Sequence, residues 1–292
     1  MDEVGLVRHL NSGDQMPSVV VMGSCLTNLA ALFLMSDYKW ERPNNAAVLR
    51  SDHFVDKFID LNGYLPSQDE FTAQVKWKAG FEKEGPRWLN ECYRDMVGHL
   101  EVPLDKPGLF ETLDTRSIDL VLMDNLHDSH SVLMHKRPKG GEPVYSLPFS
   151  LSRCENEQEL LDDFYYGSPQ AAEDSVKNWV RIIRFVQSRQ PRAKIMFYCA
   201  HACTSVDLPD RYERALRFHE LLAPLAPELG ITVIPPLELP PEVTRMPEDR
   251  DHFDMQIYRA MAGHIVLCHM ANLRGVAEPD LPEVHASKLT PA

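Results

Sequence analysis

The segment from Val19 to Thr27, VVVMGSCLT, decides the fold. Its apolar half is short and lacks polar alternation, which is typical of a strand buried on both faces of a parallel sheet. Gly23 permits a tight turn directly after this strand. A helix with an apolar face follows at once, from Ser24 or Cys25 onward. The segment therefore predicts a strand–turn–helix unit of an α/β protein.

Four more apolar runs of the same character lie along the chain, and helical patterns lie between them. The five predicted strands are Ser18–Met22, Ala46–Leu49, Asp119–Met123, Lys194–Tyr198 and Ile231–Ile234. Further helices are predicted from Ser168-Pro169, from Asp207 or Leu208-Pro209, and from about Phe253 to Asn272. Alternating strands and helices predict an α/β fold with a doubly wound, parallel five-stranded sheet flanked by helices.

Two long segments, 53–118 and 126–167, do not fit this alternation. The first contains a stretch with a helical pattern from Trp88 to Leu100, and the second is loop-like. Insertions of this kind usually build a substrate pocket or its lid. Residues 1–272 are predicted to form a single domain. Residues 273–292, rich in Pro, Glu and Ala, are predicted to be a flexible tail.

The composition excludes several classes of protein. The formal net charge of −13 argues against nucleic-acid binding and against docking on anionic lipid. No apolar run is long enough to span a membrane, and the polar start lacks the apolar core of a signal peptide. The six cysteines have no disulfide-framework spacing, which favours a reducing, cytoplasmic location. The oligomeric state is not determined by these features.

The first candidate site is the turn that holds Gly23, Ser24 and Cys25. In an open α/β sheet, ligands bind at the carboxyl edge of the strands, where this turn lies. A helix N-terminus lowers a thiol pKa and offers N–H donors for an oxyanion. The alternative interpretation makes Ser24 only a helix cap and Cys25 only a buried thiol.

Two further features return to the same edge of the predicted sheet. Asp249 and His252 stand three apart on a predicted turn before the last helix, where the Asp could hold the imidazole in the tautomer of a general base. Asp124 and Asn125 follow the third strand, where the Asn amide could donate to an oxyanion. By themselves, Asp and Asn are also common turn formers.

This combination resembles the SGNH (GDSL-type) hydrolases, a superfamily mostly of esterases, lipases and carbohydrate O-acyltransferases. The resemblance implies a flavodoxin-like, three-layer fold. It implies His252 as the base, Asp249 as the residue that orients it, and Asn125 as an oxyanion donor. Gly23 lies beside the nucleophile and belongs to the same predicted oxyanion-binding turn.

The chain departs from the family pattern at the nucleophile. The usual Gly-Asp-Ser-Leu is Gly23-Ser24-Cys25-Leu26 here, which favours Cys25 over Ser24. The Gly-Ser-Cys form is similar to GSCFA-type members and to WcbI-type enzymes of capsule polysaccharide biosynthesis, which are associated with coenzyme A and acetyl transfer. The family also has a glycine in the second of its conserved sequence blocks, and this chain has no clear equivalent of that glycine. Arg50 or Ser51 could supply the contact that the glycine makes in the family.

These residues predict an acyl-transfer enzyme, either an esterase or a carbohydrate O-acyltransferase, with a Cys/Ser–His–Asp site. The expected partner is a small-molecule or glycan substrate. No cofactor is required, and a coenzyme A thioester is a possible acyl donor. The predicted substrate contacts are Arg50, Ser51, Asp124, His127 and His201, and the predicted phosphate contacts of the donor are Lys136, Arg137 and Lys139.

Two other functions remain open at this stage. A binding protein on the same scaffold would keep the pocket without catalysis. A metal-dependent hydrolase is disfavoured, because the histidines and cysteines form no complete zinc spacing. The candidate ligands for it would be His127, His130, His201 and His252. Tyr165, Tyr166 and Trp179 are interpreted either as sugar-stacking rings or as packing residues.

Overall fold

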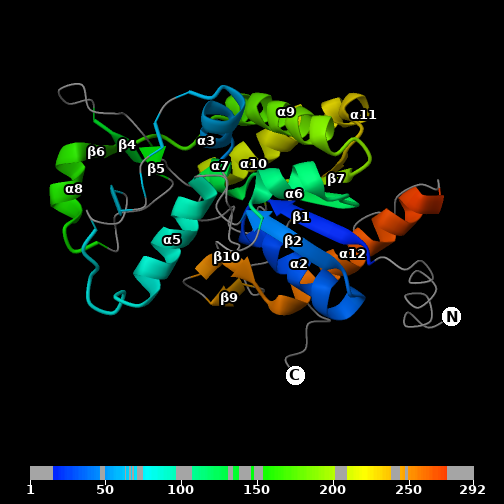
Figure 1. Ribbon diagram of the computed structural model, residues 1–292, viewed down its shortest axis with the longest axis horizontal. Coiled ribbons are helices and arrows are strands. Elements are labelled where there is room, and N and C mark those ends of the chain that lie inside the picture. Colours follow the sequence, from blue (N-terminus) through cyan, green and yellow to red (C-terminus); the bar gives the residue numbers. More distant parts are fainter. Residues whose placement is uncertain are drawn as a thin grey trace.

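A five-stranded parallel sheet forms the centre of the protein (Figure 1). In the computed structural model, the described residues are 16–46, 50–62, 64–65, 67, 69–70, 75–96, 107–130, 134–137, 146–147, 154–200, 209–237, 244–246 and 249–274. The strand order is β2-β1-β3-β7-β8, which is the flavodoxin-like order 2-1-3-4-5 when only the sheet strands are counted. The predicted α/β fold is therefore confirmed.

The strands of this sheet are β1 (Ser18–Met22), β2 (Glu41–Ala46), β3 (Leu120–Asp124), β7 (Lys194–Tyr198) and β8 (Thr232–Ile234). The remaining strands are short: β4 (Met134–Lys136), β5 (Ser146–Leu147), β6 (Phe164–Tyr166), β9 (Thr244–Met246) and β10 (Asp249–Phe253). The helices are α2 (Cys25–Tyr38), α3 (Ser51–Phe54), η1 (Val55–Ile59), α5 (Glu84–Met96), α6 (Leu109–Thr115), α7 (Leu126–His130), α8 (Glu157–Asp163), α9 (Ala172–Arg189), α10 (Pro209–Leu222), η3 (Ala223–Leu225), α11 (Ala226–Leu229) and α12 (Met255–Arg274).

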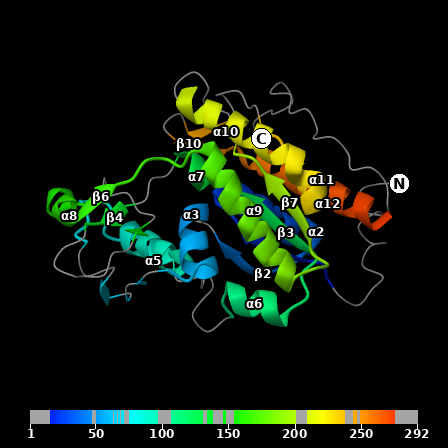
Figure 2. The same ribbon diagram turned by 90° about the horizontal axis from the view of Figure 1, so that it is seen from above.

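Each face of the sheet is covered by its own hydrophobic cluster. Along β1, Val19 and Val21 pack with α2 and α12, whereas Val20 and Met22 pack with α6 and α9 on the other face. Side chains alternate between the faces of a strand, so an uninterrupted apolar strand supplies both clusters. Figures 1 and 2 show the resulting three layers, with α2 and α12 on one side and α9 and α10 on the other.

The second strand lies earlier in the chain than the sequence predicts. The sequence favours Ala46–Leu49, whereas β2 spans Glu41–Ala46, and residues 47–49 lie outside the described residues. The physical reason is that β2 is an edge strand, paired with β1 alone. An edge strand tolerates polar residues and a proline such as Pro43, so it has no apolar signature.

The described parts of the two insertions pack against each other. The segment predicted to be loop-like contains α7, α8 and the three-stranded antiparallel sheet β5-β4-β6. A separate hydrophobic cluster joins Leu89 of α5 to Met134 and Phe164 of this small sheet. In both views the small sheet and α8 lie beyond the carboxyl ends of the central strands (Figures 1 and 2).

Helix boundaries agree closely with the sequence at two places and less well at a third. The helix α10 begins at Pro209, and α12 spans Met255–Arg274, so it extends two residues into the predicted tail. The helix α9 begins at Ala172, three residues after the predicted start at Pro169. Residues 275–292 lie outside the described residues. In the part of the chain that the structure describes, no helix is both long and apolar enough to cross a bilayer.

One half-buried imidazole predicts how the stability of the protein responds to acid. His269 packs edge-on against Trp40, with ring centroids 4.9 Å apart, and burial lowers the pKa of this histidine. Because the folded pKa lies below that of the unfolded chain, the unfolded state binds more protons, and stability falls as the pH drops through this range. We expect His269→Gln to lose less unfolding free energy than the wild type between pH 7 and 5. Urea titrations at several pH values measure the free energy of unfolding of both proteins. The same dependence on pH in the wild type and in His269→Gln would contradict the prediction.

Candidate functional site

The buried carboxylate of Asp124 joins the two turns at the centre of the candidate site. Its Oδ2 accepts hydrogen bonds from the Ser24 amide at 2.9 Å, the Thr27 amide at 3.3 Å and the Thr27 hydroxyl at 2.5 Å. Its Oδ1 accepts from the Leu126 amide at 3.1 Å. The turn after β1 is thereby fixed to the turn after β3. The predicted contact of Asp124 with substrate stays a prediction.

Gly23 is required for this close approach. A Cβ atom added at Gly23 would lie 2.4 Å from Asp124 Oδ2 and 2.9 Å from the Asp124 amide nitrogen. No side chain fits there without moving the carboxylate or the β3 backbone. Gly23 therefore lets the β1–α2 turn lie directly against Asp124, which places the beginning of α2 beside Asn125.

Ser24 and Cys25 occupy different environments although they are neighbours. Ser24 is fully buried and is the N-cap of α2, with its Oγ accepting from the Leu26 amide at 3.0 Å. Cys25 is the first residue of α2 and is only partly buried against the core. The hydroxyl thus has a structural task, whereas the thiol lies at the helix N-terminus with part of its surface accessible.

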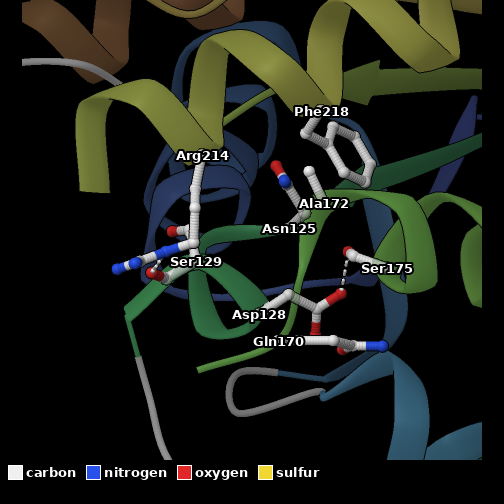
Figure 3. Close-up of a pocket in the computed structure, with 8 residues that line it drawn as sticks. All are labelled: Asn125, Asp128, Ser129, Gln170, Ala172, Ser175, Arg214 and Phe218. Carbon is white, nitrogen blue, oxygen red and sulfur yellow. Dashed lines mark hydrogen bonds between the residues drawn. The ribbon is translucent and has the colours of Figure 1, made fainter. Parts of the chain in front are cut away.

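The side chain of Asn125 is fixed by a hydrogen bond to its amide oxygen. Its Oδ1 accepts a 2.7 Å hydrogen bond from the backbone amide of Ala200, at the end of β7. This bond identifies which end of the amide is oxygen, because a backbone N–H can only donate. Among the described residues, none accepts a hydrogen bond from Asn125 Nδ2. The side chain lies at the wall of a cavity of about 10 Å³ between α7, α9 and α10 (Figure 3).

Arg50 and Ser51, the residues after β2, are held by protein groups. The Arg50 guanidinium pairs with Asp52, with Nη2–Oδ2 at 2.6 Å and Nε–Oδ1 at 3.1 Å. Ser51 is fully buried; its amide donates to Asp128 Oδ1 at 2.9 Å and its hydroxyl to Gln170 Oε1 at 3.1 Å. Both residues lie at the expected sheet edge, and their substrate contacts stay predictions.

Asp128 is the site residue that the sequence analysis missed. Besides Ser51, its carboxyl accepts from Ser175 Oγ at 2.5 Å (Figure 3) and from Trp179 Nε1 at 2.8 Å. Burial raises its pKa, and the charge of Asp52 adds to this, while the hydrogen bonds oppose it. The one available sequence signal was its spacing, one helical turn after Asn125.

Trp179 is a packing residue, not a sugar-stacking ring. Its side chain is fully buried, lies edge-on to Phe197 at 4.9 Å and donates to Asp128. An indole that faces the core cannot meet a substrate, so this alternative is wrong. Tyr165 and Tyr166, by contrast, are substantially exposed.

The predicted Asp–His pair lies on a strand instead of a turn. Asp249–Phe253 forms β10, which pairs with β9 through an irregular register between Asp249 and Phe253. The side chains of Asp249 and His252 lie outside the described part of the structure. Phe253, the residue after His252, is fully buried in the cluster against which Cys25 packs. The end of β10 therefore belongs to the same hydrophobic cluster as the candidate nucleophile.

The predicted basic cluster is divided between two faces of the small sheet. His135 and Lys136 lie on β4 and Arg137 follows, so His135 and Arg137 share one face and Lys136 faces the other way. The Arg137 guanidinium lies over the Tyr165 ring at 5.4 Å. Lys139 lies outside the described residues. The predicted phosphate contacts of Lys136, Arg137 and Lys139 stay predictions.

The predicted histidine contacts are only partly described. His127 on α7 is half-buried. His201 and the side chain of His130 lie outside the described residues. Within the described ranges, no group of three His, Cys, Asp or Glu side chains is arranged to hold a metal ion.

Comparisons with known proteins give structural likeness alone. No protein-family model and no curated protein matches the chain. A lipase/acylhydrolase from Enterococcus faecalis is 12% identical over 91% of this chain and 100% of that one, with a TM-score of 0.44. A proposed GDSL-like lipase from Parabacteroides merdae is 9% identical over 90% and 97%, with a TM-score of 0.43. A family two carbohydrate esterase from Clostridium thermocellum is 9% identical over 89% and 65%, with a TM-score of 0.41. At such identities and TM-scores, the chemistry of this chain has to be argued from its own residues.

Proposed function

We propose that the protein is an acyl-transfer enzyme, an esterase or a carbohydrate O-acyltransferase, in which Cys25 forms a thioester intermediate. The observation that carries this proposal is the four-donor contact of Asp124, which holds the start of α2 beside Asn125. The contact brings the beginning of α2, where the partly buried Cys25 lies, to the turn that carries Asn125, and this supports the proposal. A nucleophile near an amide donor is the pairing that covalent acyl transfer requires.

The nucleophile is assigned to Cys25 because Ser24 has another task. The Ser24 hydroxyl caps α2 and is fully buried. To act as a nucleophile, this hydroxyl would have to give up its hydrogen bond with the Leu26 amide and move to the surface. The Cys25 thiol needs no such rearrangement, and the N-terminal end of a 14-residue helix favours its thiolate.

The first half of the reaction forms the thioester. His252 takes the Cys25 thiol proton as the sulfur attacks the carbonyl carbon of the donor. The Cys25 amide and Asn125 Nδ2 donate to the oxygen that becomes negative. The Ser24 amide is assigned elsewhere, since it donates to Asp124. The intermediate collapses as the bond to the leaving group breaks, and the leaving group takes the proton from His252.

The second half transfers the acyl group. His252 removes a proton from a sugar hydroxyl or from water, whose oxygen attacks the thioester carbon. The carbon–sulfur bond breaks and the Cys25 sulfur recovers the proton from His252. Asp249 is assigned to orient the imidazole. Transfer to a sugar gives an O-acyltransferase and transfer to water gives an esterase.

Intact-protein mass spectrometry tests this proposal. We would expose the wild type, Cys25→Ala, Ser24→Ala and His252→Ala separately to acetyl-CoA and to an activated acetyl ester. One acetyl adduct is expected on the wild type and on Ser24→Ala, none on Cys25→Ala, and slow acylation of His252→Ala. The donor that forms the adduct distinguishes a transferase that uses coenzyme A from an esterase.

Two outcomes would overturn parts of the proposal. An adduct lost only in Ser24→Ala would make the serine the nucleophile. No adduct on any variant with either donor would support a binding protein that uses the same scaffold without catalysis.

A further inference from the structure

The helix that follows Asn125 is too short to be rigid by itself. The helix α7 has five residues, and an isolated helix of one turn is not stable in water. Inside it, the Asp128 and Ser129 amides donate to the Asn125 carbonyl at 3.1 and 3.2 Å. Its geometry, and that of Asn125, must therefore come from groups outside the helix.

Two carboxylates supply those contacts, one before α7 and one inside it. Asp124 accepts from the Leu126 amide at the beginning of the helix. Asp128, the middle residue of the helix, is only 1% exposed and accepts from Ser51, Ser175 and Trp179. Asp124 connects α7 to α2, whereas Asp128 connects it to α3 and α9.

The contacts of Asp128 and of its neighbour Ser129 join α7 to α3, α9 and α10. Ser51 begins α3 directly after Arg50, and Ser175 and Trp179 belong to the first two turns of α9. The Asp128 carbonyl also accepts from the Gln170 amide at 3.2 Å, and Arg214 of α10 donates to the Ser129 carbonyl at 3.2 Å. Figure 3 shows Asp128, Gln170, Ser175 and Arg214 around the same small cavity as Asn125.

We infer that Asp128 is a positioning residue, which keeps the Asn125 amide where it can donate to the oxyanion. The inference rests on the acyl-transfer function proposed above. Losing one oxyanion donor typically lowers kcat by about 10²–10³-fold. A displacement of about 1 Å can have a comparable effect. Asp128 contacts no substrate in this scheme and acts through α7.

The variant Asp128→Asn tests this without changing the volume of the side chain. The Ser51 amide and the Trp179 indole can only donate, and an asparagine has a single oxygen to accept from them. At least one of the two bonds is therefore lost or lengthened. With an activated acetyl ester, we expect kcat to fall by about 10–100-fold. We expect KM to change by less than about threefold, because ground-state binding does not depend on an oxyanion donor.

A double-mutant cycle with Asn125→Ala separates positioning from general destabilisation. If Asp128 acts through Asn125, then Asp128→Asn lowers kcat by less than about threefold once Asn125 is absent. A second full 10–100-fold loss in the double mutant would overturn the inference. Trp179→Phe and Ser175→Ala each remove one hydrogen bond to Asp128. Each is expected to lower kcat by less than Asp128→Asn does, and to lower it little further once Asn125 is replaced by alanine. Should Asp128→Asn fail to fold, these two variants complete the cycle.

A structural measurement distinguishes this inference from the proposed function. In crystal structures of the wild type and Asp128→Asn, we expect α7 and the Asn125 side chain to shift while Asp124 keeps its contacts with Ser24 and Thr27. An Asn125 amide in the same place in both structures would overturn the positioning role, whatever the activity. A shifted Asn125 in a protein that forms no acetyl adduct would instead keep the positioning role and reject the enzyme.

Discussion

Cys25→Ala is expected to lower the rate of acyl transfer by about 10³-fold or more while the protein stays folded. The thiol is only partly buried at the start of α2, so its removal leaves no large cavity in the core. The neighbouring residue Ser24 carries a hydroxyl, but this hydroxyl is buried as the N-cap of α2, so it is not expected to replace the thiol as nucleophile. The measurement is the initial rate of hydrolysis of an activated acetyl ester, with thermal unfolding to confirm the fold.

Ser24→Ala is the matched control for this loss. Removing an N-cap side chain costs about 1 kcal/mol of stability. Acylation of Cys25 should nevertheless remain within about tenfold of the wild type, because the backbone of the turn is still held by Asp124. Equal losses in the two variants would point to damage of the turn and not to a missing nucleophile. Cys25→Ala with wild-type activity would remove the thiol from the mechanism.

The central sheet was predictable because its strands are covered on both faces. Uninterrupted apolar runs identified β1, β3, β7 and β8 to within about one residue. The edge strand β2 was placed too late, because a strand with one neighbour can be polar and can contain Pro43. The small sheet was not predicted at all, since strands of two or three residues have no measurable periodicity.

The position of the site was predictable, but the role of its carboxylates was not. Parallel strands end at one edge, so the residues after β1 and β3 had to approach each other. Nothing local shows that Asp124 would bind the Ser24 and Thr27 amides, which are 100 and 97 residues away in the chain. Asp128 was missed for the same reason, since its three donors come from α3 and α9.

The stability of the whole site is expected to depend on Asp124. Asp124→Ala would leave the Ser24 and Thr27 amides, the Thr27 hydroxyl and the Leu126 amide without their acceptor, in a fully buried position. A buried donor left unsatisfied costs about 1–3 kcal/mol. Even with partial relaxation, we expect a loss of about 3 kcal/mol or more in the free energy of unfolding, measured by urea titration. The acylation rate of Cys25 should fall as well, because the two turns are no longer joined.

Asp119 provides the matched control at the opposite end of the same strand pair. It precedes β3, is exposed, and accepts from the Ser18 amide at 2.8 Å and the Ser18 hydroxyl at 3.0 Å. In Asp119→Ala, water can replace the lost acceptor, so we expect a cost of about 1 kcal/mol or less and unchanged acylation. Similar losses of stability for both variants would mean that burial of the Asp124 contacts does not set their strength. Normal acylation in folded Asp124→Ala would mean that the two turns stay together without the carboxylate.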